Sequence, residues 1–428
     1  GAIVLMAHYD TVPATPGAND NGTAVATLLE VGRALRAAPS LRNDVILLFT
    51  DGEEPAPRFG STAFVERHPY AAEVRLVINL EAIGGSGASE MIEVVGNEGA
   101  LISHYAEAVS QPVASSVLDD IVELIGGSNT DISPFRDRGI AGFEFAYLHG
   151  SPIYHSPDDD LDSVHRGSLQ HHGTHALGLV RHFGDIDLGG LADLHSEVYF
   201  TLVGKVVVHY PAWLGVVLIA VAGLMLAGAL WLGSSSRRPR PKALAAGTGW
   251  MLLLVVGVGI VLGIGWKLLS AALWDRSGPG GLVSSTWLAA MVVVSAGPTV
   301  LVYRRLVARL GAGVMEWATV TLWWALGLVT AVTLPGAGYL FVWPVLAAVL
   351  VAVFGPARRW IALGLVALPT VVLILPVVDT FFQMGLPRPG NTDSQLPEMA
   401  LLVGLLVSGA AALLAPLFGH GAGTDRSA

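Results

Sequence analysis

The feature that most constrains this chain is a series of long, uncharged apolar runs in its second half. Residues 212–233 contain no charged side chain, and about twenty helical residues at roughly 1.5 Å each span a hydrocarbon core of about 30 Å. Comparable runs follow at 247–270, 284–303, 313–333, 337–354, 361–378 and 399–417. The sequence therefore predicts an all-α transmembrane domain of about seven helices over residues 212–418, embedded in a lipid bilayer and followed by a short tail, 419–428.

Basic residues follow the first, third and fifth of these runs: Arg237, Arg238, Arg240, Lys242, Arg304, Arg305, Arg309, Arg358 and Arg359. Loops rich in Lys and Arg lie on the cytoplasmic side of a membrane. The alternation predicts that the region before residue 212 lies on the extracytoplasmic or lumenal side, as does the polar loop 379–398. Five tryptophans near the ends of the runs are expected to anchor at lipid headgroups: Trp213, Trp231, Trp266, Trp323 and Trp343.

Carboxylates and histidines are concentrated before about residue 200, so the chain has two parts of different composition. The net charge of −10 argues against a nucleic-acid partner, because no basic surface is available to neutralise phosphates. The chain has no cysteine, so a metal ion would have to be bound by His, Asp and Glu side chains.

Short apolar runs alternate with helical patterns between residues 1 and 185. The runs are Ala2–Ala7, Val45–Phe49, Val74–Leu80, Ile92–Val95 and Ile140–Leu148. Helical periodicity covers Thr23–Ala37, 99–110 and 167–183. This alternation predicts an α/β sandwich with a mostly parallel mixed sheet over residues 1–188, joined to the membrane domain by a juxtamembrane linker, 189–211.

Polar side chains follow these apolar runs, at the ends of strands where ligands collect in such sheets. They are His8, Asp10 and Asp20, then Asp51, Glu53 and Glu54, then Glu81, and finally His155. Two histidines with several carboxylates are the ligands that a pair of hydrolytic zinc ions requires. The adjacent residues Glu53 and Glu54 could supply a general base and a metal ligand.

Each of these elements also has a simpler interpretation. The pair His8 and Asp10 could form an ordinary hydrogen-bonded turn, and Asp20 could cap the helix that follows it. Residues 51–54 could be a solvated loop. A buried Glu81 is harder to explain without a partner, because burying an unpaired carboxylate is costly.

Two further groups of polar residues are expected to lie mostly on the surface or in solvated loops. The first is a second histidine cluster: His165, His171, His172, His175 and His182. The second is the acidic run Asp158, Asp159 and Asp160, which is expected to solvate a loop and cap a helix, although one of its carboxylates could support His155.

The candidate residues resemble the di-zinc family of aminopeptidases and glutamate carboxypeptidases, and within it the vacuolar and endoplasmic-reticulum membrane proteases. Five segments carry the resemblance: His8-x-Asp10, Gly17-Ala-Asn-Asp20-Asn-Gly22, Asp51-Gly-Glu53-Glu54, Asn79-Leu-Glu81-Ala and Tyr154-His155. The likeness extends from residue 1 to about residue 211. The resemblance implies a zinc exopeptidase-like fold and a peptide substrate.

The resemblance also implies a role for each residue. Asp20 would bridge two zinc ions, with His8 and Glu81 on one ion and Glu54 and His155 on the other. Glu53 would be the general base, Asp10 would orient the imidazole of His8, and Tyr154 would donate a hydrogen bond to the oxyanion.

The chain departs from the family pattern in two ways. Many soluble members have Asp at the position of Glu81, whereas the membrane branch tends to have Glu. The segment that normally precedes the first strand is expected to be missing. The sequence thus predicts a membrane-anchored zinc aminopeptidase; the alternatives are a catalytically silent binding or regulatory protein, a carboxypeptidase and a glutaminyl cyclase.

Overall fold

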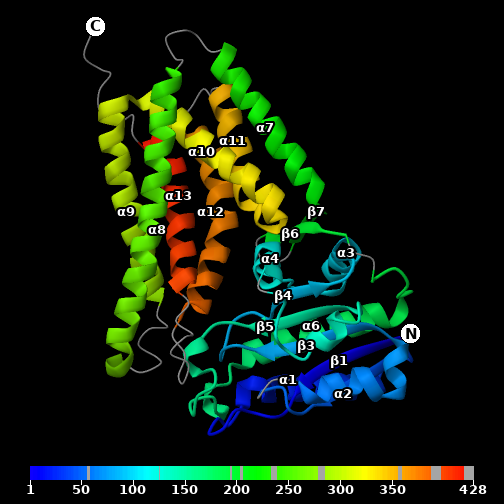
Figure 1. Ribbon diagram of the computed structural model, residues 1–428. Helices are drawn as coiled ribbons and strands as arrows, with labels where there is room; N and C mark the ends of the chain where they lie inside the picture. Colours follow the sequence, from blue (N-terminus) through cyan, green and yellow to red (C-terminus); the bar gives the residue numbers. More distant parts are fainter. Residues whose placement is uncertain are drawn as a thin grey trace. The chain divides into compact units, whose positions relative to one another are not determined.

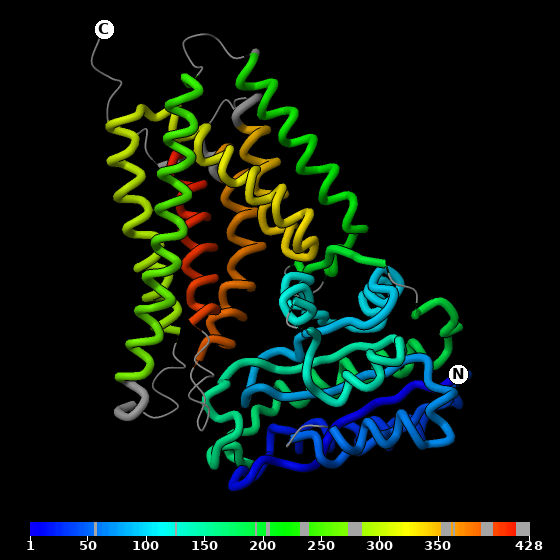
Figure 2. Tube along the Cα trace, viewed as in Figure 1, coloured from blue at the N-terminus to red at the C-terminus, as the bar shows by residue number. Residues whose placement is uncertain are grey.

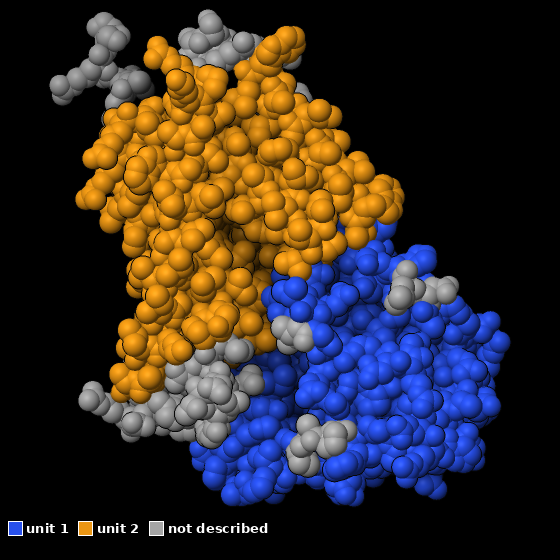
Figure 3. Space-filling view, in the orientation of Figure 1, with its two compact units in different colours: residues 1–211, 386–394 blue, residues 212–385, 395–428 orange. Residues whose placement is uncertain are grey.

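A computed structural model gives the fold of the protein. It describes residues 1–54, 58–124, 126–192, 195–202, 206–232, 239–277, 285–354, 359–386 and 397–418. Two compact units are present, of which the first comprises Gly1–Pro211 and Leu386 and the second begins at Ala212 (Figure 3). The predicted tail 419–428 and the basic residues Arg237, Arg238 and Arg358 lie outside the described residues.

A five-stranded mixed sheet forms the centre of the first unit (Figure 1). Its strands are β1 Ala2–His8, β2 Asp44–Thr50, β3 Val74–Ala82, β4 Glu90–Val95 and β5 Ala141–Tyr147. Their spatial order is β2-β1-β3-β5-β4, and every neighbouring pair is parallel except β4 with β5. The predicted mostly parallel sheet is confirmed, and all five predicted strands lie within two residues of the observed ones.

Six helices accompany the sheet: α1 Ala24–Arg36, α2 Phe59–Arg67, α3 Glu98–Ala108, α4 Ser116–Leu124, α5 Ser133–Arg136 and α6 Arg166–Asp185. The helices predicted at Thr23–Ala37, 99–110 and 167–183 correspond to α1, α3 and α6. Residues of these three helices pack against one face of the sheet, while α2 and α5 pack against the other face. Both faces are therefore covered, which explains why the strands are almost uniformly apolar.

The face of the sheet that is covered by α2 and α5 becomes polar toward the carboxyl ends of the strands. On the face of α2 and α5, the buried side chains Val4 and Met6 of β1 are followed by the buried His8. On the same face, Val77 of β3 is followed by the buried Asn79 and Glu81. The interior thus changes from apolar to polar at one end of the sheet, where the candidate site residues lie.

Residues 189–211 were expected to be a linker, but they contain an antiparallel strand pair, β6 Glu197–Leu202 and β7 Val206–Pro211. Tyr199 of β6 is fully buried, and its hydroxyl donates to Asp119 Oδ2 of α4 at 3.0 Å. Ser116 of α4 donates its hydroxyl to the carbonyl of Tyr199 at 2.9 Å. These contacts explain why this segment belongs to the first unit.

The second unit is all-α, as predicted (Figure 2). Its helices are α7 Ala212–Leu232, α8 Pro241–Ser277, α9 Ser285–Leu310, α10 Ala312–Thr333, α11 Tyr339–Phe354, α12 Arg359–Met384 and α13 Pro397–Phe418. Six of these described helices are long and apolar enough to cross a membrane, and α11 contains a shorter apolar stretch. The expected loop 379–398 is shorter than predicted, because α12 continues to Met384.

Two tryptophans of this unit were expected at lipid headgroups, and the structure corrects this. Trp266 and Trp323 are buried, and their indole N–H groups donate to the carbonyls of Gly385 and Gly409 at 2.9 and 3.0 Å. Trp213 and Trp231 are exposed, as an interfacial position requires. Position near a helix end in the sequence could not distinguish buried from exposed tryptophans, because the packing of the helices determines which indole rings are enclosed.

Candidate metal centre

His8 ends β1 with its side chain buried and its ring oriented by the backbone. Its Nδ1 lies 3.0 Å from the carbonyl oxygen of Asp10, so Nδ1–H is the donor in this contact and Nε2 is the nitrogen that points into the site. Nε2 then faces two carboxylates, Asp20 Oδ1 and Glu81 Oε2, each at 3.3 Å. One histidine and two carboxylates thus converge on one point.

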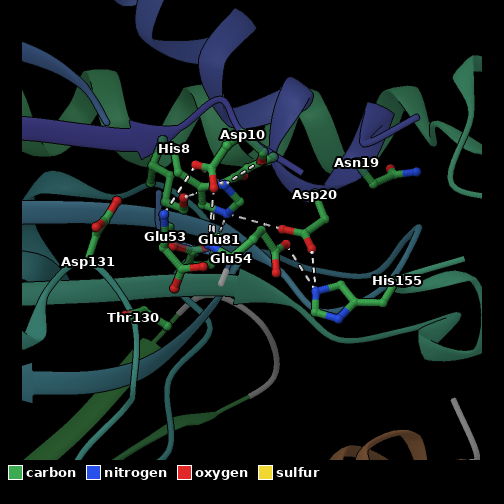
Figure 4. A network of polar contacts seen from close by, with 12 residues as sticks. His8, Asp10, Asn19, Asp20, Glu53, Glu54, Glu81, Thr130, Asp131 and His155 are labelled. Carbon is green, nitrogen blue, oxygen red and sulfur yellow. Dashed lines mark hydrogen bonds and ion pairs between the residues drawn. The ribbon is translucent and has the colours of Figure 1, made fainter. Parts of the chain in front are cut away.

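Asp20 connects this group to a second one (Figure 4). Its other oxygen, Oδ2, lies 3.2 Å from His155 Nε2, and Glu54 Oε1 lies 3.0 Å from the same nitrogen. Asp20 therefore has a histidine on each side, and each histidine has one further glutamate. The five predicted ligands, His8, Asp20, Glu54, Glu81 and His155, are all brought together.

A tightly built loop holds Asp20 in place. Asp159 accepts three hydrogen bonds with its carboxylate: from Asn19 N–H and Asn19 Nδ2 at 2.8 Å each, and from Asp20 N–H at 3.1 Å. Gly17 begins the turn with φ +70°, and a Cβ there would lie 2.1 Å from Thr11 Cγ2. The Asp20–Asn21 peptide bond is cis. The N-cap position of α1 is Thr23, so Asp20 does not have the capping role that its sequence context allowed.

Asp10 has a different position from the one expected. Its carboxylate Oδ1 is 3.7 Å from His8 Nδ1, so the backbone carbonyl of Asp10, rather than its side chain, orients that ring. The carboxylate instead accepts from the backbone N–H groups of Glu53 and Glu54, at 3.3 and 3.1 Å. Asp10 thereby positions the backbone of both glutamates, and residues 53–54 are an anchored turn rather than a freely solvated loop.

Two amides support Glu81. Asn21 Nδ2 donates to Glu81 Oε2 and Asn79 Nδ2 donates to Oε1, both at 3.1 Å. Asn21 Nδ2 also donates to the carbonyl of Leu80 at 2.7 Å. Both oxygens of the longer glutamate side chain are therefore oriented, and Oε2 still faces His8.

Burial and mutual charge shift the pKa values of these groups strongly. Burial opposes protonation of His155, but the carboxylates of Asp20 and Glu54 outweigh it and raise its pKa to about 9. Burial also opposes protonation of His8, yet Glu81 and Asp20 raise its pKa far above the usual value. Burial, followed by the charge of Glu81, raises the pKa of Glu53 to about 9. The carboxylates outnumber the histidines, which creates a negative potential that divalent cations would neutralise.

The spacing of the ligand atoms fits zinc. Two ligands of a tetrahedral zinc ion, each about 2.0–2.1 Å from it, lie about 3.3 Å apart. The four nitrogen-to-oxygen distances around His8 and His155 are 3.0 to 3.3 Å. Asp20 Oδ2 is buried and has no hydrogen bond of good geometry among the described residues. Oxygens and imidazoles without sulfur form the donor set of hydrolytic zinc sites.

Three acidic residues near the site were not identified from the sequence. Asp159 was assigned to loop solvation or helix capping, yet it is fully buried and holds the Asp20 loop. Asp131 is also fully buried and accepts a hydrogen bond from Thr50 at the end of β2. Glu144 lies in the centre of β5, and burial, together with the charges of Glu93 and Glu81, raises its pKa to about 8. Only Glu144 carried a signal of its burial in the sequence, because it is the one acidic residue inside the otherwise apolar strand β5.

Two histidines of the second cluster are buried, not surface residues. His172 and His175 are fully buried on α6, and burial lowers the pKa of each to about 3. His165 is exposed and accepts from Ser168 N–H at the start of α6, at 3.2 Å. His182 Nε2 lies 2.9 Å from Nδ1 of His104 on α3, so these two rings satisfy each other.

Tyr154 stacks on His155, with ring centroids 3.7 Å apart and an angle of 18° between the planes. It also lines a cavity of about 60 Å³ together with His8, Asp20, Glu53 and Glu81. The general-base candidate and the stacked tyrosine therefore border the same space as the metal ligands. An α/β unit that collects two histidines and several carboxylates at its strand ends has the fold and the donor set that are typical of metal-dependent hydrolases.

Comparison with known families agrees with this class. Residues 1–180 match the model of peptidase family M28. The chain is 32% identical over 272 residues to endoplasmic reticulum metallopeptidase 1 of Mus musculus, covering 62% of this chain and 29% of that protein. It is 28% identical over 263 residues to a vacuolar membrane protease of Yarrowia lipolytica, covering 60% of this chain and 26% of the relative.

Similar solved structures include a zinc aminopeptidase from Bacillus subtilis, BSAP. That match has 26% identity and a TM-score of 0.34, and it covers 45% of this chain and 48% of the other. The chain spans less than a third of the length of the curated relatives named above.

Proposed function

We propose that the first unit is a two-zinc aminopeptidase domain that hydrolyses peptides and is anchored by the helices of the second unit. The observation that carries the proposal is the position of Asp20. Its two oxygens face two different histidines, and each histidine faces one further glutamate. The match of residues 1–180 to a peptidase family supports peptide hydrolysis as the reaction.

The ligands divide into two sets that share Asp20. His8 and Glu81 would hold one zinc ion, and His155 and Glu54 would hold the other. Bound there, two zinc ions would polarise the substrate carbonyl and lower the pKa of a shared water. The carbonyl of Asp10 keeps the proton of His8 on Nδ1, which leaves Nε2 free to act as a ligand.

Glu53 is the proposed general base. It lines the same cavity as His8, Asp20 and Glu81. In this role its carboxylate accepts a proton from the attacking water and then delivers that proton to the leaving amine. The carboxylate of Asp10 positions the base, because it accepts from the backbone N–H of Glu53. Tyr154 borders the cavity and is the proposed donor to the oxyanion.

The test compares the chain, in a membrane or detergent, with its Glu53→Gln variant. We expect about two zinc ions per chain in both proteins, and hydrolysis of aminoacyl substrates by the parent that falls at least about a hundredfold in the variant. Blocking the substrate's amino terminus should abolish hydrolysis if the domain is an aminopeptidase. A well-folded parent that binds no zinc, or binds it and cleaves nothing, would contradict the proposal.

Two other functions are distinguished by the same assay. A silent peptidase fold would retain zinc ligands without turnover. A carboxypeptidase would accept amino-blocked peptides, and a glutaminyl cyclase would release ammonia from amino-terminal glutamine. We favour an active peptidase over a silent fold because the proposed base and all five proposed ligands converge. The amino-blocked and glutamine substrates then decide among the three activities.

We also propose that the first unit lies on the extracytoplasmic or lumenal side. The support is the basic cluster Arg304, Arg305 and Arg309 near the end of α9, which the positive-inside rule assigns to the cytoplasm. Protease protection in sealed vesicles tests this: the first unit should be protected when the cytoplasmic face is outward. Digestion of the first unit in intact vesicles of that orientation would contradict the assignment.

A further inference from the structure

We propose that His104, Glu107 and His182 form a second metal site, separate from the candidate metal centre, that binds a transition-metal cation such as zinc. Its ligands come from the helices α3 and α6, whereas those of the candidate centre lie at strand ends and in the loops that follow them. The two sets share no residue. A metal ion at the second site would therefore not depend on the proposed peptidase function.

The packing of α3 against α6 brings the two histidines together. At Gly178 of α6, a Cβ would lie 2.6 Å from the carbonyl oxygen of Ala108 on α3, so glycine lets the two helices approach closely there. Four residues back along α3 and four residues forward along α6, His104 Nδ1 lies 2.9 Å from His182 Nε2. The two helices thus run antiparallel at this point, and about one helical turn separates the close backbone contact from the histidine pair.

Glu107 supplies an oxygen to the same place. It follows His104 by three residues, so both side chains project from one face of α3. Its Oε2 lies 4.0 Å from His182 Nε2, and one ligand atom from each of the three residues lies within 4.8 Å of the other two. Neighbouring ligand atoms of a tetrahedral zinc ion are about 3.3 Å apart. The two nitrogens would separate by about 0.4 Å, and the side chain of Glu107, which is 71% exposed, can approach without disturbing the core.

The donor set determines the kind of cation. Imidazole ligands suit zinc, copper and nickel, whereas calcium and magnesium prefer sites made of oxygens. Burial, followed by the neighbouring His104, lowers the pKa of His182, so its ring is neutral at pH 7, which is the form that binds a metal. His182 also lies in the last turn of α6, where the helix dipole favours a cation.

Other histidines of α6 are held by the backbone, and this distinguishes them from the proposed ligands. Nε2 of His171 and Nε2 of His175 lie 2.9 and 3.0 Å from the carbonyl oxygen of Gln111. His104 and His182 instead share one hydrogen bond with each other, and neither ring makes another among the residues that the structure describes. A metal ion would take the place of that single shared hydrogen, which moves to the other nitrogen of its ring.

The second site should bind zinc more weakly than the candidate metal centre. Its three side chains are partly or fully exposed, and binding must order the side chain of Glu107. We therefore expect dialysis against zinc-free buffer to leave zinc only at the candidate centre, and a further ion to bind once free zinc is supplied. The bound ion would join α3 to α6 and stabilise the contact between the two helices.

The experiment measures zinc binding to the full chain by equilibrium dialysis against rising free zinc, starting from chain purified without a histidine tag and already dialysed. We expect a further binding step in the parent. Loss of a ligand in His104→Ala or His182→Ala should weaken this step at least about tenfold, since even the partners of metal ligands contribute about ten- to a hundredfold to affinity. His68→Ala is the matched control and should leave the step unchanged, because His68 is an exposed histidine of the same unit outside the site.

Glu107→Gln tests the site without altering a packed side chain. Glutamine keeps the shape of Glu107 and removes the charged oxygen, so the further binding step should again weaken, whereas Glu66→Gln, at an exposed position on α2, should leave it unchanged. Because Glu107 is exposed, this variant should fold as the parent does. Far-ultraviolet circular dichroism checks that it does.

Two results would overturn the inference. Equal affinity of the parent and the site variants for the further zinc ion would show that this ion binds elsewhere. Equal weakening in the site variants and in the two controls would assign it to general surface binding. Zinc that remains through the first dialysis reports on the candidate metal centre, so failure of that centre and failure of the second site give different results.

Discussion

Replacing Asp159 with asparagine tests how the site is assembled, because this residue fixes Asp20 without contacting either histidine. In Asp159→Asn, one oxygen can still accept the two hydrogen bonds from Asn19, at 2.8 Å each. The other position becomes an amide NH₂ that faces the N–H of Asp20, where the carboxylate now accepts at 3.1 Å. One charge-assisted hydrogen bond is lost, and two donors are placed against each other.

The size of the effect follows from that one contact. A hydrogen bond to a charged group contributes about 1.5–3 kcal/mol, and about 1.4 kcal/mol corresponds to a factor of ten in an equilibrium constant. If the loss of this bond shifts the conformational equilibrium of the Asp20 loop away from its binding conformation by that free energy, zinc affinity falls by the same factor. The reason is that zinc binds only the fraction of molecules whose loop is ordered. We therefore expect zinc affinity to fall about ten- to a hundredfold in Asp159→Asn.

Competition with a chromophoric chelator measures the zinc dissociation constant of each variant. Asp158→Asn is the matched control, because Asp158 is adjacent and exposed and should retain wild-type affinity. Far-ultraviolet circular dichroism checks that both variants are folded. Equal zinc affinity in the two variants would refute the view that Asp159 holds the bridging ligand in place.

Three further changes test other contacts. Asp10→Ala removes the acceptor of two backbone N–H groups beside the proposed base, so kcat/KM should fall about tenfold or more while zinc content stays unchanged; loss of zinc instead would make Asp10 part of the metal-binding structure. Gly17→Ala should weaken zinc binding, because φ +70° alone costs about 1–2 kcal/mol for alanine and the new Cβ meets Thr11; unchanged affinity would show that the turn adapts. Burial raises the pKa of Asp119 well above 3.8. The free energy of unfolding of the wild type should therefore fall as pH rises above about 4, by at most about 1.4 kcal/mol per pH unit, because the buried carboxyl must ionise. Thermal unfolding should show Asp119→Asn gaining stability relative to wild type over that pH range, and a difference that does not change with pH would contradict this.

Apolar periodicity was sufficient to predict the sheet of the first unit. Runs such as Val74–Leu80 correspond to strands because both faces of the sheet are covered, and the helix α1 has a clear apolar stripe. The antiparallel pair β6–β7 was missed because its apolar residues precede a membrane run and were assigned to a linker. Its position depends on the hydrogen bonds of Tyr199 with Ser116 and Asp119 of α4. These are tertiary contacts that no local sequence pattern encodes.

The candidate ligands could be predicted because they lie at the ends of strands or in the loops that follow them, and parallel strands bring their carboxyl ends to one edge. The residues that orient them could not be predicted in the same way. Asp159 contacts Asn19 across 140 positions of the chain, and the carboxylate of Asp10 contacts backbone rather than the imidazole that its spacing suggested. Loop conformation decides these contacts, and a carboxylate in a polar loop carries no local sign of burial.

The ligands of the candidate metal centre come from widely separated parts of the first unit. His8 ends β1, Glu81 lies near the end of β3, and His155 follows β5. No short segment contains the set, so chelation requires the whole sheet to be assembled. Binding of zinc to this centre would therefore favour the complete fold by mass action, and a chain cleaved or misassembled between β1 and β5 would lose both the metal and the stability that it contributes. In a compartment where zinc is scarce, metal supply would then set how long the domain survives as well as how fast it works.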